Sequence, residues 1–143
     1  MEQPFVVAER EVDLPRIIVW DAFIDPELVS GWLAEAVIVP EVGGEYNLTW
    51  LHRVGQPDTF GRIAALWTPE LLVVDTTNLG RLEFTLHELP GGMRGTSTLI
   101  RVEVGMAGDP VLAERVAEQW RVHLEQLEQL LRGHPVVWPT RPE

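Results

Sequence analysis

Two residue types are missing from this chain of 143 residues, cysteine and lysine. Without cysteine, the chain has no disulfide, no thiol nucleophile and no thiolate metal ligand. Without lysine, no side-chain amine is present to form a Schiff base with a carbonyl substrate. Both of these routes to covalent catalysis are therefore excluded.

Positive charge and long apolar runs are also scarce. Arginine provides all 11 basic residues against 22 acidic ones, which gives a net charge of −11. This charge repels nucleic acids and anionic membrane surfaces, so we expect neither as a partner. No run of about 18 apolar residues is present, and no membrane span is predicted. The acidic start of the chain lacks the features of a secretory signal, so a cytoplasmic location is expected.

The remaining composition is typical of a globular protein. Apolar residues make up 45% of the chain, and its length fits one domain. No internal repeat or linker divides it. We therefore expect a single domain over residues 1–143, with a proline-rich tail at 134–143.

The first quarter of the chain predicts a strand followed by a broken helix. The predicted elements are a strand and two short helices, at residues 5–12, 15–24 and 26–33. Asp13 is placed to cap the first helix, with Pro15 in its first turn. Ile17, Ile18 and Trp20 are among the apolar positions of this amphipathic helix. Pro26 forces the residue before it out of helical geometry, so a second short helix is predicted to start there.

The middle of the chain predicts an antiparallel meander. Turn signals rich in glycine, proline and asparagine separate six candidate strands, at residues 36–40, 44–52, 58–67, 70–77, 80–88 and 94–104. Side-chain alternation gives most of these strands one apolar and one polar face. In strand 58–67 the two faces are equally plausible as the core side, so the position of Arg62 is open.

The last predicted element is a long amphipathic helix from Asp109-Pro110 to about Arg132, closed by Gly133. Its acidic residues, among them Glu128, are expected on a solvated face. Its apolar stripe needs one large apolar surface, and the concave side of the sheet is the only candidate. The element order is that of an α+β helix-grip fold, in which a curved antiparallel sheet of about seven strands surrounds a long C-terminal helix.

Short motifs along nearly the whole chain carry a family resemblance. They are P…VW.AF.DPEL…WL at Pro15–Leu33, GG.Y…W at Gly43–Trp50, G.I..LWTPELLV at Gly61–Val73, F.L.ELPGGMRGT at Phe84–Thr96, and a tryptophan followed by L..LE.LLRG in the last helix. Their number and order resemble the START/SRPBCC (Bet v 1-like) superfamily, and in particular its heat-shock-protein ATPase activator homologues (AHSA-type domains). One departure is Gln119, because the family often has glycine before the tryptophan.

The resemblance implies a domain folded around a cavity that binds a small hydrophobic molecule without catalysis. A first alternative is an enzyme similar to polyketide cyclase/dehydratases, which would use a cavity histidine. A second is a protein-binding module with a chaperone or a second copy of the chain as partner. An exposed apolar patch around Trp32, Trp67 or Trp138 would favour the second alternative, although Trp32 is otherwise expected near the cavity rim and Trp20 in the core.

Periodicity selects the residues expected to line the cavity. They are Tyr46, Leu48, Trp50, His52, Phe84, Ile100, Val102, Trp120, His123, Leu124 and Leu127. His123 is the only strongly polar residue within the apolar stripe of the last helix. A buried imidazole needs a hydrogen-bond partner, which could be a ligand group or simply a residue of the sheet. His52 is the second polar candidate, and it could equally be a rim residue.

No metal site and no cofactor are predicted. A zinc site needs at least three converging ligands, commonly with two histidines closely spaced. The four histidines, His52, His87, His123 and His134, are isolated along the chain. His87 is expected at the surface.

Overall fold

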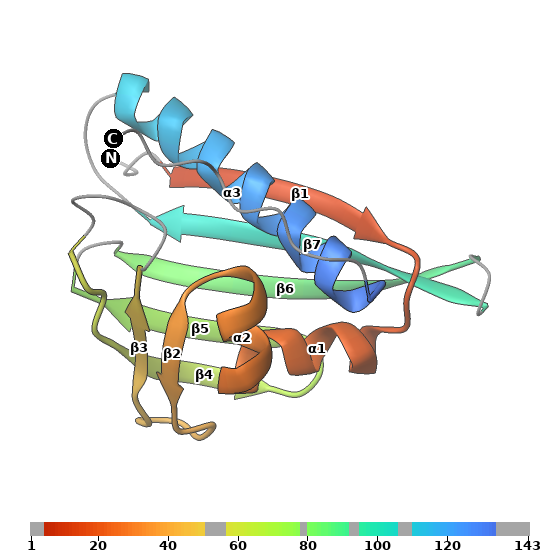
Figure 1. Ribbon diagram of the computed structural model, residues 1–143, viewed down its shortest axis with the longest axis horizontal. Coiled ribbons are helices and arrows are strands. Elements are labelled where there is room, and N and C mark those ends of the chain that lie inside the picture. Colours follow the sequence, from red (N-terminus) through yellow and green to blue (C-terminus); the bar gives the residue numbers. More distant parts are fainter. Residues whose placement is uncertain (1–4, 51–56, 78–79, 92–94, 106–109, 134–143) are drawn as a thin grey trace.

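The computed structural model describes residues 5–50, 57–77, 80–91, 95–105 and 110–133. Within these ranges the chain forms seven strands and three helices (Figure 1). In chain order they are β1 (Phe5–Val12), α1 (Arg16–Ile24), α2 (Pro26–Trp32), β2 (Glu35–Ile38), β3 (Tyr46–Thr49), β4 (Gly61–Trp67), β5 (Leu71–Thr76), β6 (Arg81–Pro90), β7 (Thr96–Gly105) and α3 (Pro110–Leu131). The predicted order of elements is confirmed.

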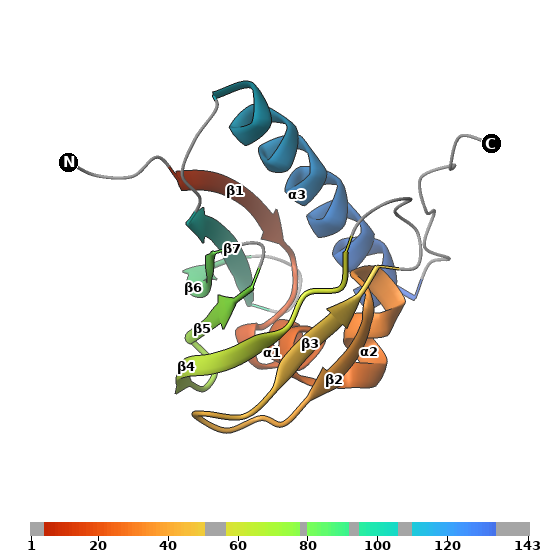
Figure 2. The same cartoon turned by 90° about the vertical axis from the view of Figure 1, so that its left-hand side faces the viewer.

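The strands form two antiparallel sheets. The larger has the order β1-β7-β6-β5-β4, and the smaller pairs β2 with β3. Two isolated bridges, Glu45 to Arg62 and Leu48 to Thr59, join β3 to the region of β4. Figure 2 shows the larger sheet curving around the interior, with α3 along one side and β2, β3 and α2 along the other. The strands thus enclose a core between both sheets and α3.

The inner faces of β3, β6 and β7 are those predicted from side-chain alternation. Their buried side chains are Tyr46, Leu48, Leu82, Phe84, Leu86, Thr98, Ile100, Val102 and Val104. The polar residues between them, such as Arg81, Glu83 and His87, lie on the outer face. The interior is therefore largely apolar, and charge is confined to the outside of the sheet.

Strand β4 changes faces partway along its length. Gly61 and Ile63 are buried, so Arg62 points to solvent, where its Nη1 donates to the Gly43 carbonyl at 3.0 Å. The pairing with β5 shifts register between Ile63 and Ala65. Because a bulge reverses the alternation that follows it, Trp67 at the end of the strand is 67% exposed.

The start of α1 differs from the prediction. Its N-cap is Pro15, which provides no side-chain hydrogen bond, so the predicted cap at Asp13 is wrong. The helix is also apolar on both sides. Val19, Trp20, Ala22 and Phe23 are buried, whereas Ile17 and Ile18 lie on the exposed side.

Two aromatic side chains donate hydrogen bonds to backbone carbonyls at the break between α1 and α2. Proline has no N–H, so Pro26 leaves the carbonyl of Ala22 without its usual helical donor four residues later. The indole Nε1 of Trp32 donates to this carbonyl at 2.7 Å. The hydroxyl of Tyr46 donates to the next carbonyl, that of Phe23, also at 2.7 Å. Residues of α2 and β3 therefore clamp the C-terminal end of α1.

Helix α3 packs across β1 and against α1 and α2. It ends before Gly133, whose φ of 74° is the left-handed conformation of a glycine C-cap, as predicted. Glu128 is not on a solvated face as expected. Its carboxylate accepts a hydrogen bond from Arg10 of β1 at 2.7 Å and from Arg132 at 2.9 Å. The side chain of Glu128 is 16% exposed, and it joins α3 to the edge of the sheet.

Candidate functional site

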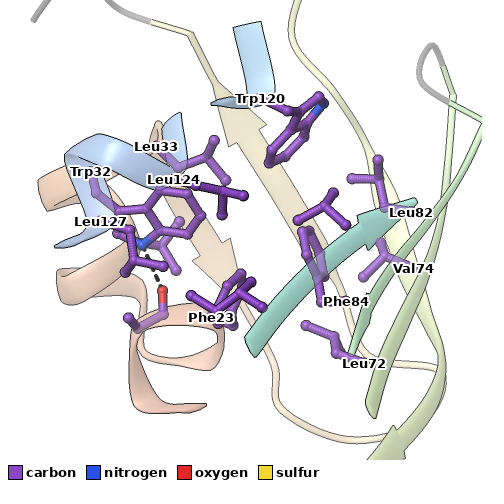
Figure 3. Close-up of a cluster of buried hydrophobic side chains, with 14 of the residues drawn as sticks. Phe23, Trp32, Leu33, Leu72, Val74, Leu82, Phe84, Trp120, Leu124 and Leu127 are labelled. Atoms are coloured by element: carbon purple, nitrogen blue, oxygen red, sulfur yellow. Dashed lines mark hydrogen bonds between the residues drawn. The ribbon is translucent and has the colours of Figure 1, made fainter. Parts of the chain in front are cut away.

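Six aromatic side chains form a continuous series through the interior. We call this series the aromatic row. In contact order it consists of Trp32, Phe23, Phe84, Trp120, His123 and Trp50, with ring-centroid separations of 5.3, 5.0, 5.9, 5.3 and 5.8 Å. Figure 3 shows the first four among the buried apolar side chains. Such spacings are those of favourable edge-to-face and tilted ring pairs.

The row is assembled from segments that are far apart in the sequence. Helices α1 and α2 contribute Phe23 and Trp32, and β6 contributes Phe84. The other end is made by two residues of α3, Trp120 and His123, and by Trp50 directly after β3. The row therefore runs from the broken helix to the inner face of α3.

The α3 end of the row carries polar atoms in an apolar setting. His123 is 5% exposed and Gln126 is 2% exposed. Residues three apart on a helix share a face, and Nδ1 of His123 lies 3.2 Å from Oε1 of Gln126. When Nδ1 carries the proton, it donates to this amide oxygen. Nearby, the indole Nε1 of Trp50 donates to the hydroxyl of Thr59 at 2.9 Å.

Ten of the eleven side chains predicted to line the cavity lie in the interior. They are Tyr46, Leu48, Trp50, Phe84, Ile100, Val102, Trp120, His123, Leu124 and Leu127. The eleventh, His52, lies outside the described residues. The structure brings His123 together with Trp50 and Trp120, which sequence alone does not show.

Tyr46 is held by the fold rather than available for proton transfer. Burial raises the pKa of its phenol well above the ordinary value of 10.0. Its hydroxyl is also engaged with the Phe23 carbonyl. The side chain therefore supplies an apolar ring surface and a structural hydrogen bond.

Sequence reasoning missed several interior residues. Trp32 was expected near the rim but is fully buried, because its indole completes the end of α1. Phe23, Thr59 and Gln126 were not selected. The position of Gln126, three residues after His123, was a usable signal because a buried imidazole requires a partner.

Two hollows on the outer surface are lined by described residues. One of about 610 Å³ lies over β3, β4 and β5 and is lined by Glu45, Asn47, Phe60, Gly61, Arg62, Asp75, Thr76 and Thr77. Another of about 540 Å³ lies beside the start of α3, at Val111, Glu114, Arg115 and Glu118. Neither is lined by a residue of the aromatic row, so both are separate from the interior site.

Comparison with known proteins supplies the family. The model of the family described as "Activator of Hsp90 ATPase homolog 1-like protein" matches residues 13–132. The chain belongs to this family. The resemblance seen in the motifs from Pro15 onward is thereby confirmed. No curated protein matches the chain significantly.

Solved structures share the fold of this family member at low sequence identity. Protein MLL2253 from Mesorhizobium loti is 23% identical with a TM-score of 0.75, over 91% of this chain and 98% of that one. Protein SSP2350 from Staphylococcus saprophyticus is 19% identical with a TM-score of 0.77, over 94% and 96%. DynU16, described as a protein in the dynemicin biosynthetic locus, is 16% identical with a TM-score of 0.74, over 94% of this chain and 49% of that one. The helix-grip (Bet v 1-like) fold is confirmed.

Among the described residues, no three histidine, aspartate or glutamate side chains gather closely enough to hold a metal ion. In the same part of the chain, no helix combines the length and the apolar character needed to cross a membrane.

Proposed function

We propose that this chain binds a small, largely apolar molecule between the larger sheet and α3, without catalysing its conversion. The observation that carries the proposal is the α3 end of the aromatic row, where two indole rings flank His123. Ligand pockets are typically lined by aromatic and aliphatic side chains with a few convergent polar groups. Trp50 and Trp120 supply the aromatic surface, and the His123–Gln126 pair supplies the polar group.

Binding is favoured over acid–base catalysis by the partner of His123. A catalytic imidazole needs a nitrogen directed at the reacting group, and an imidazole without a protein partner would have favoured the enzyme. Here Nδ1 of His123 lies against the Gln126 amide. A neutral amide, unlike a carboxylate, does not stabilise the imidazolium that proton transfer would form, so the pair is better suited to orient a ligand carbonyl or hydroxyl.

The proposal can be tested with a neutral fluorescent naphthalene, N-phenyl-1-naphthylamine. A neutral probe is needed because the net charge of −11 repels the anionic dyes in common use. We expect saturable fluorescence enhancement with the wild-type chain. Trp120→Leu should weaken binding roughly 2- to 12-fold, which corresponds to the loss of one aromatic contact.

Trp67→Leu is the matched control, because it makes the same substitution at an exposed position outside the aromatic row. It should bind the probe as the wild type does. The proposal fails if the folded wild-type chain shows no saturable binding. It also fails if Trp120→Leu and Trp67→Leu bind equally well.

A second candidate function is protein binding through the outer face of β4. Trp67 is 67% exposed at the last position of this edge strand, and Phe60 is exposed beyond its other end. Exposed apolar patches mark interaction sites in soluble proteins. The family description suggests Hsp90 as the partner to test. Stimulation of the ATPase of purified Hsp90 by the wild-type chain, lost in Trp67→Ala, would support this function.

A further inference from the structure

Among the described residues, one fully buried side-chain polar atom has no hydrogen-bond partner. The indole Nε1 of Trp20 makes no hydrogen bond to any described residue, although this side chain is only 1% exposed. Buried polar groups are nearly always hydrogen-bonded, and each exception calls for an explanation. Phenylalanine would fill much of the same space without burying an unpaired N–H.

The contrast with two other buried tryptophans sharpens this exception. Trp32 donates its N–H to the Ala22 carbonyl, and Trp50 donates to the Thr59 hydroxyl. In both hydrogen bonds the donor–acceptor distance is below 3 Å. Trp32 and Trp50 of the aromatic row therefore have acceptors for their indole N–H groups, whereas the fully buried Nε1 of Trp20 has none among the described residues.

The position of Trp20 connects it to the proposed site. It lies on α1 three residues before Phe23, so both side chains are on the same face of the helix. Phe23 belongs to the aromatic row, and Trp20 belongs to the same buried cluster as the rest of that row. Its N–H is therefore part of the same buried interior as the row.

We infer that the ligand carries an acceptor oxygen, a carbonyl or ether, that accepts a hydrogen bond from the Trp20 indole N–H. This inference rests on the proposed function and narrows it. The inference adds a hydrogen-bond acceptor to a ligand that is otherwise described by the aromatic surface and the polar group near His123. A pure hydrocarbon would leave the Trp20 N–H unpaired and should bind less tightly.

Two probes of nearly equal shape test the inference, 2-acetylnaphthalene and 2-isopropylnaphthalene. The first has a carbonyl oxygen where the second has a methyl group. The readout is the indole N–H region of a ¹H–¹⁵N correlation spectrum of the wild-type chain, with Trp20 assigned through the backbone. We expect the ketone to move the Trp20 N–H signal downfield and the hydrocarbon to leave its hydrogen-bond state unchanged.

Affinity measurements on variants give the second arm. Trp20→Phe should weaken ketone binding about 3- to 10-fold, the range for one hydrogen bond, and leave hydrocarbon binding nearly unchanged. Trp67→Phe should change neither. If Trp20→Phe does not fold, the wild-type spectrum decides alone.

The possible failures are distinguishable. Equal responses of the Trp20 signal to both probes, or equal effects of Trp20→Phe on both affinities, overturn the inference while binding itself stands. The inference is also overturned if the ketone does not change the chemical shift of the Trp20 N–H because this group is bonded only to water. Absence of binding by either probe overturns the proposed function together with the inference.

Discussion

Removal of a single hydroxyl tests whether the clamp at the end of α1 stabilises the fold. Tyr46→Phe keeps the ring and deletes the donor that lies 2.7 Å from the Phe23 carbonyl. This carbonyl belongs to the last turn of α1, where carbonyls have no partner within the helix. The substitution therefore leaves a buried acceptor unsatisfied and changes no charge and little volume.

The expected cost is about 1–3 kcal/mol of unfolding free energy, the penalty for an unsatisfied buried polar group. For a domain of this size, that corresponds to a fall in Tm of about 3–9 °C. Urea denaturation followed by tryptophan fluorescence measures the free energy, and calorimetry measures Tm. An unchanged m-value would show that the denatured state is not the origin of the effect.

Ser30→Ala is the matched control, since it also removes a hydroxyl that donates to a backbone carbonyl, that of Pro26 at 2.8 Å, but at an exposed position. It should cost less than about 0.5 kcal/mol. Equal stability of Tyr46→Phe and Ser30→Ala would refute the reasoning. Tyrosinate formation at the ordinary pKa of 10.0 in the folded chain would also refute the reasoning. Any tyrosinate signal comes from Tyr46, because the chain has no other tyrosine.

Four further predictions follow from the same contacts. In the wild type, burial raises the pKa of Tyr46, so the folded state holds this proton more tightly than the unfolded state, and stability should fall as the pH rises above about 10 in alkaline denaturation. Glu83 lies opposite Glu103, and the hydrogen bond between the two carboxyls raises the pKa of Glu83. Glu83→Gln should therefore stabilise the fold at pH 7 by about 0.2–1 kcal/mol at low salt. Denaturation measured in high salt should show a smaller gain in stability. Burial works to raise the pKa of Glu128, but the hydrogen bonds from Arg10 and Arg132 outweigh it and lower the pKa. The stability that Glu128 provides is therefore present above its ordinary pKa and is lost as the pH falls below it, and Arg10→Met should flatten an acid-denaturation curve in that range. A Cβ on Gly61 would lie 2.7 Å from Cγ1 of Val74 and 2.8 Å from the Tyr46 carbonyl oxygen, so Gly61→Ala should cost about 1–3 kcal/mol in urea denaturation. A cost below that of Gly105→Ala, where the nearest atom to the added Cβ lies at 3.4 Å, would contradict this packing.

Much of the fold could be predicted because alternation and helical periodicity report burial directly. The parity of β3, β6 and β7 identified Leu48, Phe84 and Val102 as interior residues without any knowledge of their neighbours. The same reasoning left Arg62 undecided. A bulge between Ile63 and Ala65 reverses the parity within β4, and no local sequence pattern marks it.

The contacts that complete the site depend on tertiary structure. Pro26 leaves the carbonyl of Ala22 without a donor, but the indole of Trp32 reaches this carbonyl only once α2 has folded back beside α1. Glu128 follows the pattern of a solvated helix face, yet Arg10 of β1 reaches it across the edge of the sheet. The aromatic row likewise joins residues from five segments, and periodicity within any one segment gives no information about which rings meet.

The clamp on α1 also bears on how members of this family could diversify. At one end of the aromatic row, the Trp32 indole donates to the Ala22 carbonyl, and the Phe23 carbonyl accepts from Tyr46. The fold requires both of these hydrogen bonds to the backbone. At the other end, Trp50 and His123 are bonded to the side chains of Thr59 and Gln126. Substitutions at the first end alter stability together with pocket shape, whereas paired substitutions at the second can reshape the pocket with the backbone left intact. We expect evolutionary change in ligand preference to be concentrated on the inner face of α3 and at the end of β3.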